Sequence, residues 1–241
     1  AVLTAIGRDA EGDELVAACG RLGVVTDHAY RSEDLPTDRY MAVEGANGLI
    51  AAIADAHSLE AAGDKVLRPL SDGSLGSAAS PWAGSIALDG NLTAVLLAEI
   101  AASPLFAAAD LRVAPASPGK AERLLPLIGH RGAVLYVNLE EAGLLARRDF
   151  ADAVAGAEGL LALGASRVLV TDGGRACAEG TQGSGVISAT PPKVMVARVT
   201  GAGDTFMAAH IVAERRGAGR DAALEAAIKA AATYVAGEAP A

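Results

Sequence analysis

The sequence predicts an α/β fold with three layers, in which a mostly parallel sheet lies between two layers of helices. Short apolar runs of strand length alternate along the chain with segments of helical periodicity, and this alternation is typical of parallel sheets covered on both faces. Polar clusters follow four of the expected strands, and ligands of such sheets gather at the carboxyl ends of the strands. We expect one domain over residues 1–241.

The first expected elements are a strand at 2–6, a helix at 10–22 and two strands at 39–43 and 49–53. The sequence Gly-Ala-Asn-Gly at 45–48 is a hairpin signal between these two strands. Because the hairpin interrupts the alternation of strands and helices, we expect it to leave the main sheet as an edge or lid over about 37–55. A weak helix at 61–70 and a loop rich in Gly and Ser at 71–85 follow.

The rest of the chain continues the alternation. Further strands are expected at 85–88, 111–114, 133–137, 167–171, 176–179, 186–189 and 193–197. Further helices are expected at 94–102, 118–127, 140–145, 150–163, 207–216 and 221–235. Thr93 supplies a hydroxyl N-cap for the first of these helices. The chain opens directly on a strand, so we expect the natural protein to have residues before Ala1.

Composition narrows the classes of function. Hydrophobic residues make up 51% of the chain and aromatic residues only 3%, so the core is expected to consist mostly of Ala, Leu, Val and Ile. The net charge of −9 argues against a general nucleic-acid or anionic-membrane surface. No apolar run is long enough to span a membrane. Cys19 and Cys177 show no metal-binding spacing, and we expect a reduced, cytoplasmic protein.

The segment 199–206 carries two glycines around one small residue, followed at once by Asp204. An apolar run precedes it and a helical segment follows, so the sequence predicts a turn between a strand and a helix. The first N–H groups of that helix have no partner within it and lie at the positive end of its dipole. Gly201 and Gly203 let the backbone approach a ligand closely, which favours an anion site for a phosphate. Asp204 is then either the N-cap of the helix or a general base.

Polar residues also end several of the other expected strands. Asn138 and Glu141 are three residues apart where a strand becomes a helix, so they can face the same way. They are either an Asn cap with a solvated Glu or a pair that suits a hydrated Mg²⁺. Asn91 either contacts a ligand at the end of its strand, or it is a turn residue that caps the next helix. Gly173 and the residues around it suit an ordinary turn.

Three of these motifs resemble one family over nearly the whole chain. The sequence Val-Thr-Gly-Ala-Gly-Asp-Thr-Phe at 199–206, with its Ala-rich helix, resembles the C-terminal signature of the ribokinase-like (PfkB) carbohydrate and nucleoside kinases. Asn138–Glu141 resembles the Asn-x-x-Glu motif of that family, and Val170–Gly173 resembles its Val-Thr-x-Gly nucleotide loop. The resemblance implies a ribokinase-like α-β-α fold with a small β lid.

The resemblance also implies roles for the glycine turn. The expected activity is ATP-dependent phosphorylation of a hydroxyl group on a small sugar or nucleoside. Asp204 would bind the substrate hydroxyl and take its proton, and the amides of Gly201, Ala202 and Gly203 would hold the charge that develops on the γ-phosphate. Thr200 would contact the nucleotide.

The remaining implied roles concern cofactors and substrate. Thr171 and Gly173 would approach the phosphates or ribose of ATP. Asn138 and Glu141 would bind the nucleotide together with Mg²⁺, with Glu141 as the metal-linked carboxylate. Asn91, at a strand end on the expected substrate side, would contact the sugar or base.

Segments 53–56, 89–92 and 116–121 resemble the pseudouridine kinase branch, which implies pseudouridine as the substrate. The alternatives are another sugar of ribose or fructose type, and a non-catalytic relative that binds a nucleotide or metabolite. Arg198 stands where many members of the family carry an acidic residue, and its side chain could contact a nucleotide phosphate instead. The N-terminal substrate elements of the family lie outside this chain.

The expected partner is therefore a small molecule. The hairpin that we expect as the lid carries enough apolar side chains to pair with the same hairpin of a second copy in a homodimer. These side chains are Tyr40, Met41, Val43, Leu49 and Ile53.

Overall fold

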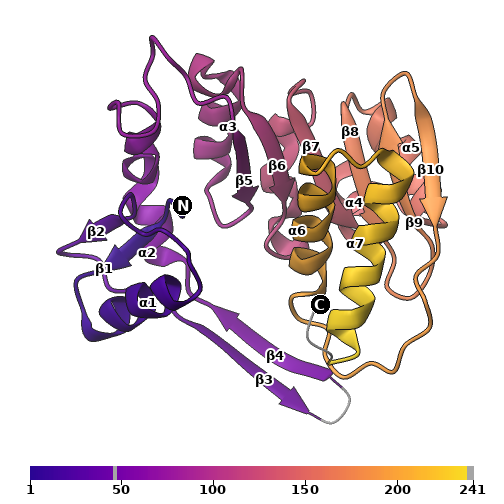
Figure 1. The fold of residues 1–241 in the computed structure, drawn as a ribbon, viewed down its shortest axis with the longest axis horizontal. Coiled ribbons are helices and arrows are strands. Elements are labelled where there is room, and N and C mark those ends of the chain that lie inside the picture. Colours follow the sequence, from indigo (N-terminus) through magenta and orange to yellow (C-terminus); the bar gives the residue numbers. More distant parts are fainter. Residues whose placement is uncertain (46–47, 238–241) are drawn as a thin grey trace.

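The computed structural model describes residues 1–45 and 48–237, and a six-stranded sheet forms its centre (Figure 1). The strands lie in the order β10-β9-β8-β7-β6-β5. Neighbours from β5 to β8 are parallel, whereas β9 and β10 add to the edge in antiparallel fashion. The expected mostly parallel sheet is confirmed. Its strands are β5 (Ser85–Asp89), β6 (Asp110–Ala114), β7 (Ala133–Asn138), β8 (Arg167–Thr171), β9 (Cys177–Thr181) and β10 (Gly185–Ala189).

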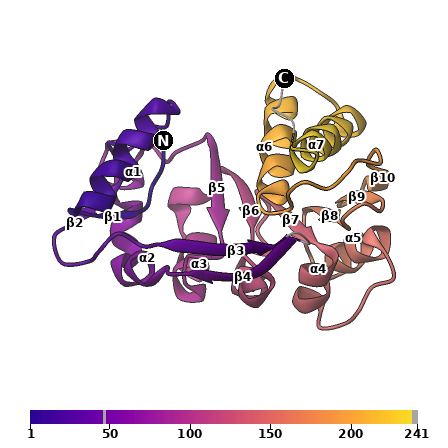
Figure 2. The same ribbon diagram turned by 90° about the horizontal axis from the view of Figure 1, so that it is seen from below.

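Helices cover both faces of this sheet, which gives the three expected layers (Figure 2). One face carries α3 (Ala94–Ala102), η3 (Pro118–Leu127), α4 (Leu139–Ala146) and α5 (Ala153–Ala162). The other face carries α6 (Ala202–Arg215) and α7 (Arg220–Val235). Within the described ranges, none of the helices combines the length and the hydrophobicity that a bilayer crossing requires.

The two helical layers bury apolar cores of different size. The larger core lies between the sheet and α3 to α5 and includes the fully buried Leu97, Leu111, Leu124, Leu135 and Leu160. The smaller core lies under α6 and α7 and includes Val134, Leu169, Phe206, Leu224 and Ile228. The second layer therefore has less apolar surface with which to hold α6.

A smaller unit lies beside β5 and contains β1 (Ala5–Gly7), α1 (Ala10–Arg21), β2 (Tyr30–Ser32), α2 (His57–Ala62) and η1 (Gly63–Leu70). β1 and β2 pair in parallel as a separate sheet. Asp9 is the N-cap of α1, and its carboxylate accepts hydrogen bonds from the hydroxyl and N–H of Thr37 and the N–H of Gly12. These bonds lower the pKa of Asp9 to about 2, so the carboxylate joins the start of α1 to the segment before the hairpin.

The expected hairpin is confirmed as β3 (Tyr40–Gly45) and β4 (Gly48–Ala54), which pair in antiparallel fashion. The middle of its expected turn, residues 46–47, lies outside the described residues. Figures 1 and 2 show the hairpin passing below the edge of the sheet at which β5 to β8 end. The hairpin therefore has the position of a lid over that edge.

The expected strand at 193–197 is wrong, because residues 190–200 form an extended loop instead. Pro191 and Pro192 follow β10 and cannot donate backbone hydrogen bonds, so the sheet ladder cannot continue there. The apolar residues Val194 and Val196 line a cavity, and Met195 is 89% exposed. Helix α6 also begins earlier than expected, directly after Gly201.

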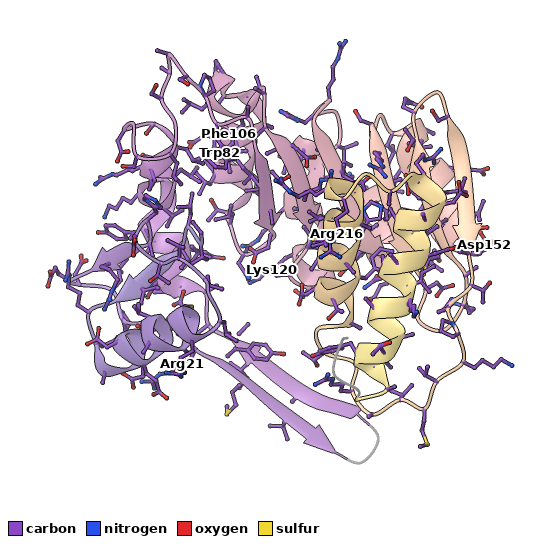
Figure 3. All side chains as sticks on the ribbon, in the orientation of Figure 1. Arg21, Trp82, Phe106, Lys120, Asp152 and Arg216 are labelled. Carbon is purple, nitrogen blue, oxygen red and sulfur yellow. The ribbon has the colours of Figure 1, made fainter. Side chains whose placement is uncertain are left out.

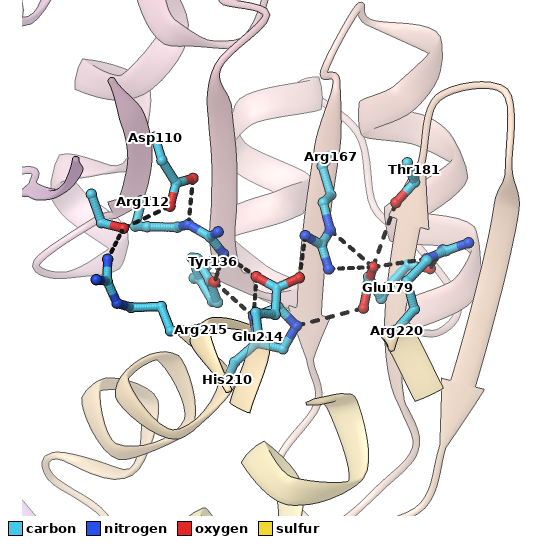
Figure 4. Close-up of polar contacts among 11 residues, drawn as sticks. Asp110, Arg112, Tyr136, Arg167, Glu179, Thr181, His210, Glu214, Arg215 and Arg220 are labelled. Carbon is cyan, nitrogen blue, oxygen red and sulfur yellow. Dashed lines mark hydrogen bonds and ion pairs between the residues drawn. The ribbon is translucent and has the colours of Figure 1, made fainter. Parts of the chain in front are cut away.

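A buried group of charged and polar side chains joins α6 and α7 to the sheet, and we call it the ionic network (Figure 4). Glu214 of α6 accepts from Arg112 of β6 and pairs with Arg167 of β8, each at 2.5 Å. Glu179 of β9 accepts from the Nε atoms of Arg167 and of Arg220 of α7, each at 2.9 Å. The other members are Asp110, Tyr136 and His210.

His210 of α6 lies fully buried at the centre of this network. The Tyr136 hydroxyl accepts from Nη1 of Arg112 at 3.0 Å and lies 2.8 Å from Nδ1 of His210. Because an arginine can only donate, the Tyr136 hydroxyl keeps its own proton, which can be donated to Nδ1 of His210. Nε2 faces Oε2 of Glu179 at 3.6 Å. Tyr136 and His210 therefore lie in a row between Arg112 and Glu179.

Glu179 is the most buried carboxylate of the network, with 0% of its surface exposed. Burial alone raises the pKa of Glu179, but His210, Arg167 and Arg220 outweigh it and lower this pKa to about 2. The folded pKa is thus below the ordinary value of 4.5. The stability that this carboxylate contributes is present above pH 4.5 and is lost as the pH falls toward 2.

We predict that Glu179→Gln lowers the free energy of unfolding by about 3–5 kcal/mol at pH 7, because it removes the carboxylate partner of Arg220 and one of the two carboxylate partners of Arg167. Urea unfolding followed by circular dichroism measures the change. The difference from the wild type should shrink as the pH falls below 4.5. Glu158→Gln, at an exposed position of α5, is the control and should stay within about 0.5 kcal/mol of the wild type. Equal urea midpoints for Glu179→Gln and the wild type would contradict the prediction.

Candidate functional site

The carboxyl ends of β5 to β8 lie along one edge of the sheet, the lower edge in Figure 1. The last residues of β7 and β8, Asn138 and Thr171, are direct neighbours in the sheet register. Helix α6 begins and helix α7 ends at the same edge. Elements far apart in the sequence therefore bring their polar ends together here.

The glycine turn at 201–204 opens α6. Gly201 is the N-cap, and its φ of +90° is a conformation that side chains other than that of glycine rarely adopt. The N–H of Ala202 donates to the Val199 carbonyl at 3.0 Å, so it closes the turn. Among the described residues, no backbone carbonyl accepts from the N–H groups of Gly203 and Asp204. These two amides, at the positive end of the helix dipole, are available to an anion.

The Asp204 side chain lies on the exposed surface of the first turn of α6. Its interpretation as the N-cap is wrong, because Gly201 holds that position and α6 begins at Ala202. Within residues 1–45 and 48–237, no hydrogen bond or ion pair engages its carboxylate. The carboxylate is therefore free to meet a ligand bound at the turn.

A cavity of about 490 Å³ adjoins this turn between the loop 190–200 and helices α6 and α7. It brings together four of the residues predicted from the sequence, namely Thr171, Gly173, Ala202 and Gly203. The rest of its lining is mostly apolar and consists of Gly174, Cys177, Pro191, Pro192, Lys193, Val194, Val196, Val199, Phe206, Ile228, Ala231, Ala232 and Val235. Burial raises the pKa of the Cys177 thiol to about 11, so this thiol is protonated and unreactive.

Asn138 and Glu141 form a capping box at the start of α4. The Asn138 side chain accepts from the Glu141 N–H, and the Glu141 carboxylate accepts from the Asn138 N–H, both at 2.8 Å. The cap interpretation from the sequence is therefore confirmed for Asn138, whereas Glu141 is buried rather than solvated. Burial raises the pKa of Glu141, the Asn138 N–H lowers it, and the charge of Glu140 raises it further. Among the described residues, no group of three or more His, Cys, Asp or Glu side chains could hold a metal ion by itself.

Asn91 lies at the end of β5, outside the cavity that holds the residues from β8 and α6. Its amide is held on both sides, because Oδ1 accepts from Lys120 at 2.6 Å and Nδ2 donates to Asp89 at 3.1 Å. Figure 3 shows Lys120 near the lower end of β5 and β6. The sequence reasoning assigned no role to Lys120, although its segment 116–121 was singled out for its resemblance to one branch.

The sequence reasoning also missed Tyr234 near the end of α7. Its hydroxyl donates to the carbonyl of Thr200 at 2.8 Å, directly before the glycine turn. The Arg198 guanidinium stacks on the Tyr234 ring and does not line the cavity. A contact between residues 34 positions apart has no local signal in the sequence.

Comparisons with solved structures find matches that cover nearly all of this chain. A carbohydrate kinase from Agrobacterium tumefaciens is 26% identical with a TM-score of 0.75, over 95% of this chain and 71% of that one. An adenosine kinase from Schistosoma mansoni in complex with 2-fluoroadenosine is 20% identical with a TM-score of 0.75, over 97% and 72%. A ribokinase from Arabidopsis thaliana complexed with ribose and ATP is 20% identical with a TM-score of 0.72, over 97% and 74%.

These structural matches show the ribokinase-like α/β fold. A comparison with curated proteins found no match. The family model described as pfkB family carbohydrate kinase matches residues 1–240. The chain therefore belongs to the pfkB family of carbohydrate kinases.

Proposed function

We propose that this protein is an ATP-dependent kinase that phosphorylates a hydroxyl group of a small sugar or nucleoside. The observation that carries the proposal is the start of α6. There, two unpartnered amides and the free carboxylate of Asp204 adjoin an apolar cavity large enough for a nucleotide base. An anion site beside an apolar cavity suits a ligand that has both a base and phosphates.

In this proposal the base of ATP occupies the cavity, and its phosphates extend toward the start of α6. Thr171 and Gly173, at the end of β8, lie in the cavity lining near the expected ribose and phosphates. Thr200 precedes the glycine turn and would contact the nucleotide through its side chain, because its carbonyl is already bonded to Tyr234. Lys193 adds a positive charge to the same lining.

The acceptor would lie on the other side of the glycine turn, below the ends of β5 and β6. Asp204 takes the proton of the acceptor hydroxyl as that oxygen attacks the γ-phosphorus, and the bond to the β,γ-bridging oxygen of ATP breaks to release ADP. The amides of Gly203 and Asp204 hold the charge on the transferring group. Donors fixed in advance suit phosphoryl transfer, which depends mainly on positioning and electrostatics.

The residues around the phosphates fit a hydrated Mg²⁺ rather than a cage of protein ligands. Glu141 uses one carboxylate oxygen in the capping box, so its other oxygen could accept a hydrogen bond from a water bound to the metal. Burial raises the pKa of Glu141 because it disfavours the charged carboxylate, so a cation beside this carboxylate would stabilise its charged form. When bound, Mg²⁺ would offset the negative charge of the phosphates, and one or two carboxylates commonly hold it together with several waters.

For the acceptor we propose a nucleoside, with pseudouridine as the first candidate. The support is the resemblance of segments 53–56, 89–92 and 116–121 to the pseudouridine kinase branch. The adenosine kinase with 2-fluoroadenosine shares the fold and binds a nucleoside, whereas the ribokinase binds ribose. Asn91, held by Lys120 and Asp89, would present its amide in a fixed orientation to the sugar or base.

The test is a coupled assay of ADP formation by the full-length protein against a panel of nucleosides, ribose and fructose-type sugars. We expect turnover with at least one acceptor and the highest kcat/KM with pseudouridine. A higher kcat/KM with ribose or a fructose-type sugar would favour the alternative sugar kinase. Saturable nucleotide binding without turnover on any acceptor would favour a non-catalytic binding protein.

We predict that Asp204→Asn lowers kcat by about 10²–10⁴-fold, because the amide cannot take the proton of the acceptor hydroxyl. Its affinity for ATP, measured by calorimetry, should stay near that of the wild type. Asp221→Asn is the matched control, since Asp221 is an exposed aspartate in the first turn of α7. Turnover of Asp204→Asn near that of the wild type would exclude its role as the base.

We also propose that the hairpin pairs across a homodimer. Met41 and Ile53 are register partners in β3 and β4, and so are Val43 and Ala51. All four side chains are exposed and lie on one face of the hairpin, since residues two apart in a strand share a face. This apolar face suits pairing with the same face of a second copy.

We predict that Ile53→Glu converts the dimer to a monomer, because it places two charges in the apolar contact. Sedimentation velocity at micromolar concentration measures the change. Val95→Glu, which alters an exposed apolar residue on α3, is the control and should remain dimeric. A wild-type protein that sediments as a monomer would contradict the prediction.

A further inference from the structure

The loop that leads into the glycine turn is attached to α7 rather than to the sheet. The N–H groups of Ala197 and Arg198 both donate to the carbonyl of Val235, at 2.8 and 3.2 Å. Residues 192–200 are exposed along their whole length. The end of α7 is therefore the main support for the chain that immediately precedes the turn.

Tyr234 makes the second attachment, directly at the turn. Its hydroxyl donates to the carbonyl of Thr200 at 2.8 Å. A Cβ atom added to Gly201 would lie 2.6 Å from the same hydroxyl oxygen. The tyrosine hydroxyl thus packs against the backbone of Gly201 as well as bonding the residue before it.

Arg198 holds Tyr234 in place from the other side. Its guanidinium lies over the Tyr234 ring, 3.7 Å from the ring centroid, and its Nε donates to the Tyr234 carbonyl at 2.8 Å. Stacking and the hydrogen bond together fix the ring that carries the hydroxyl. We call this pair the Arg198–Tyr234 clamp.

The clamp lies between two parts of the proposed site. Val196 and Val199, on either side of Arg198, line the apolar cavity. Gly201, against which the Tyr234 hydroxyl packs, opens α6 three residues before Asp204. A shift of the clamped segment would therefore move the cavity wall and the glycine turn together.

We infer that Arg198 and Tyr234 are positioning residues for phosphoryl transfer. They hold the wall of the nucleotide cavity and the start of α6 in one fixed relation, so that nucleotide, free amides and Asp204 meet correctly. The inference rests on the proposed kinase function. It gives Arg198 a role through Tyr234 rather than through contact with a phosphate.

We predict that Tyr234→Phe lowers kcat about tenfold or more and raises the KM for ATP, while the KM for the acceptor stays unchanged. The phenylalanine keeps the ring under Arg198 but removes the donor to Thr200. Arg198→Ala should show the same pattern, and Arg198→Lys should recover only part of kcat, because an ammonium lacks the flat stacking surface.

A second measurement tests whether the clamp holds the loop, and it does not depend on kinase activity. Lys193 lies exposed in the same loop, so the rate of limited trypsin cleavage after it reports how firmly the loop is held. We expect Tyr234→Phe to raise this rate several-fold. Tyr30→Phe is the matched control, since Tyr30 also lies under a cation, Lys65, and belongs to β2. It should change neither the cleavage rate nor kcat.

Wild-type cleavage and wild-type kcat in Tyr234→Phe would overturn the inference. Faster cleavage with unchanged kcat and unchanged KM for ATP would also overturn it, because the clamp would then support the loop without positioning the site. A wild-type protein that transfers phosphate to no acceptor would contradict the proposed function instead. The clamp would then be tested by two other measurements on Tyr234→Phe, its affinity for a fluorescent ATP analogue and its cleavage rate. A lower affinity with faster cleavage would support the clamp, and wild-type values of both would overturn it.

Discussion

The ionic network beneath α6 is the constraint on which the site depends. The buried residues of α6 are Phe206, Met207 and His210, so few large apolar side chains fix the position of this helix on the sheet. Glu214 and His210 instead meet arginine and tyrosine side chains of three neighbouring strands. Such bonds are directional, so they specify both the rotation of the helix about its axis and its position along that axis. Packing of small residues alone would specify neither. The N-terminal end of α6 presents the free amides, and its position follows from this anchoring.

The site itself is assembled from chain segments that end at the same edge of the sheet. β7 and β8 deliver Asn138 and Thr171 side by side because their register is fixed, and α6 starts where α7 finishes. The central sheet thus sets the side of the site that we propose binds the nucleotide. The side that we propose binds the acceptor depends on shorter-range bonds, such as those of Lys120 and Asp89 to Asn91. The hairpin passes below the same edge.

The sequence allowed the layers, the mostly parallel sheet and the glycine turn to be predicted, because each has a local pattern. Periodicity placed the helices, and the turn at 201–204 needs no distant partner to be recognised. The strand expected at 193–197 failed because its apolar residues serve a cavity and two prolines stop the ladder before it. Contacts such as Arg112 with Glu214, 102 residues apart, and Tyr234 with Thr200 have no pattern of their own in one sequence.

The place where α7 ends has an electrostatic consequence for anion binding. The last carbonyls of a helix carry partial negative charge, and those of α7 lie beside the turn that we propose binds phosphate. In a chain with a net charge of −9, this would work against a polyphosphate ligand. The carbonyls of Tyr234 and Val235 are instead covered by the Nε of Arg198 and by two backbone N–H groups. The positive end of one helix is thereby screened from the negative end of its neighbour.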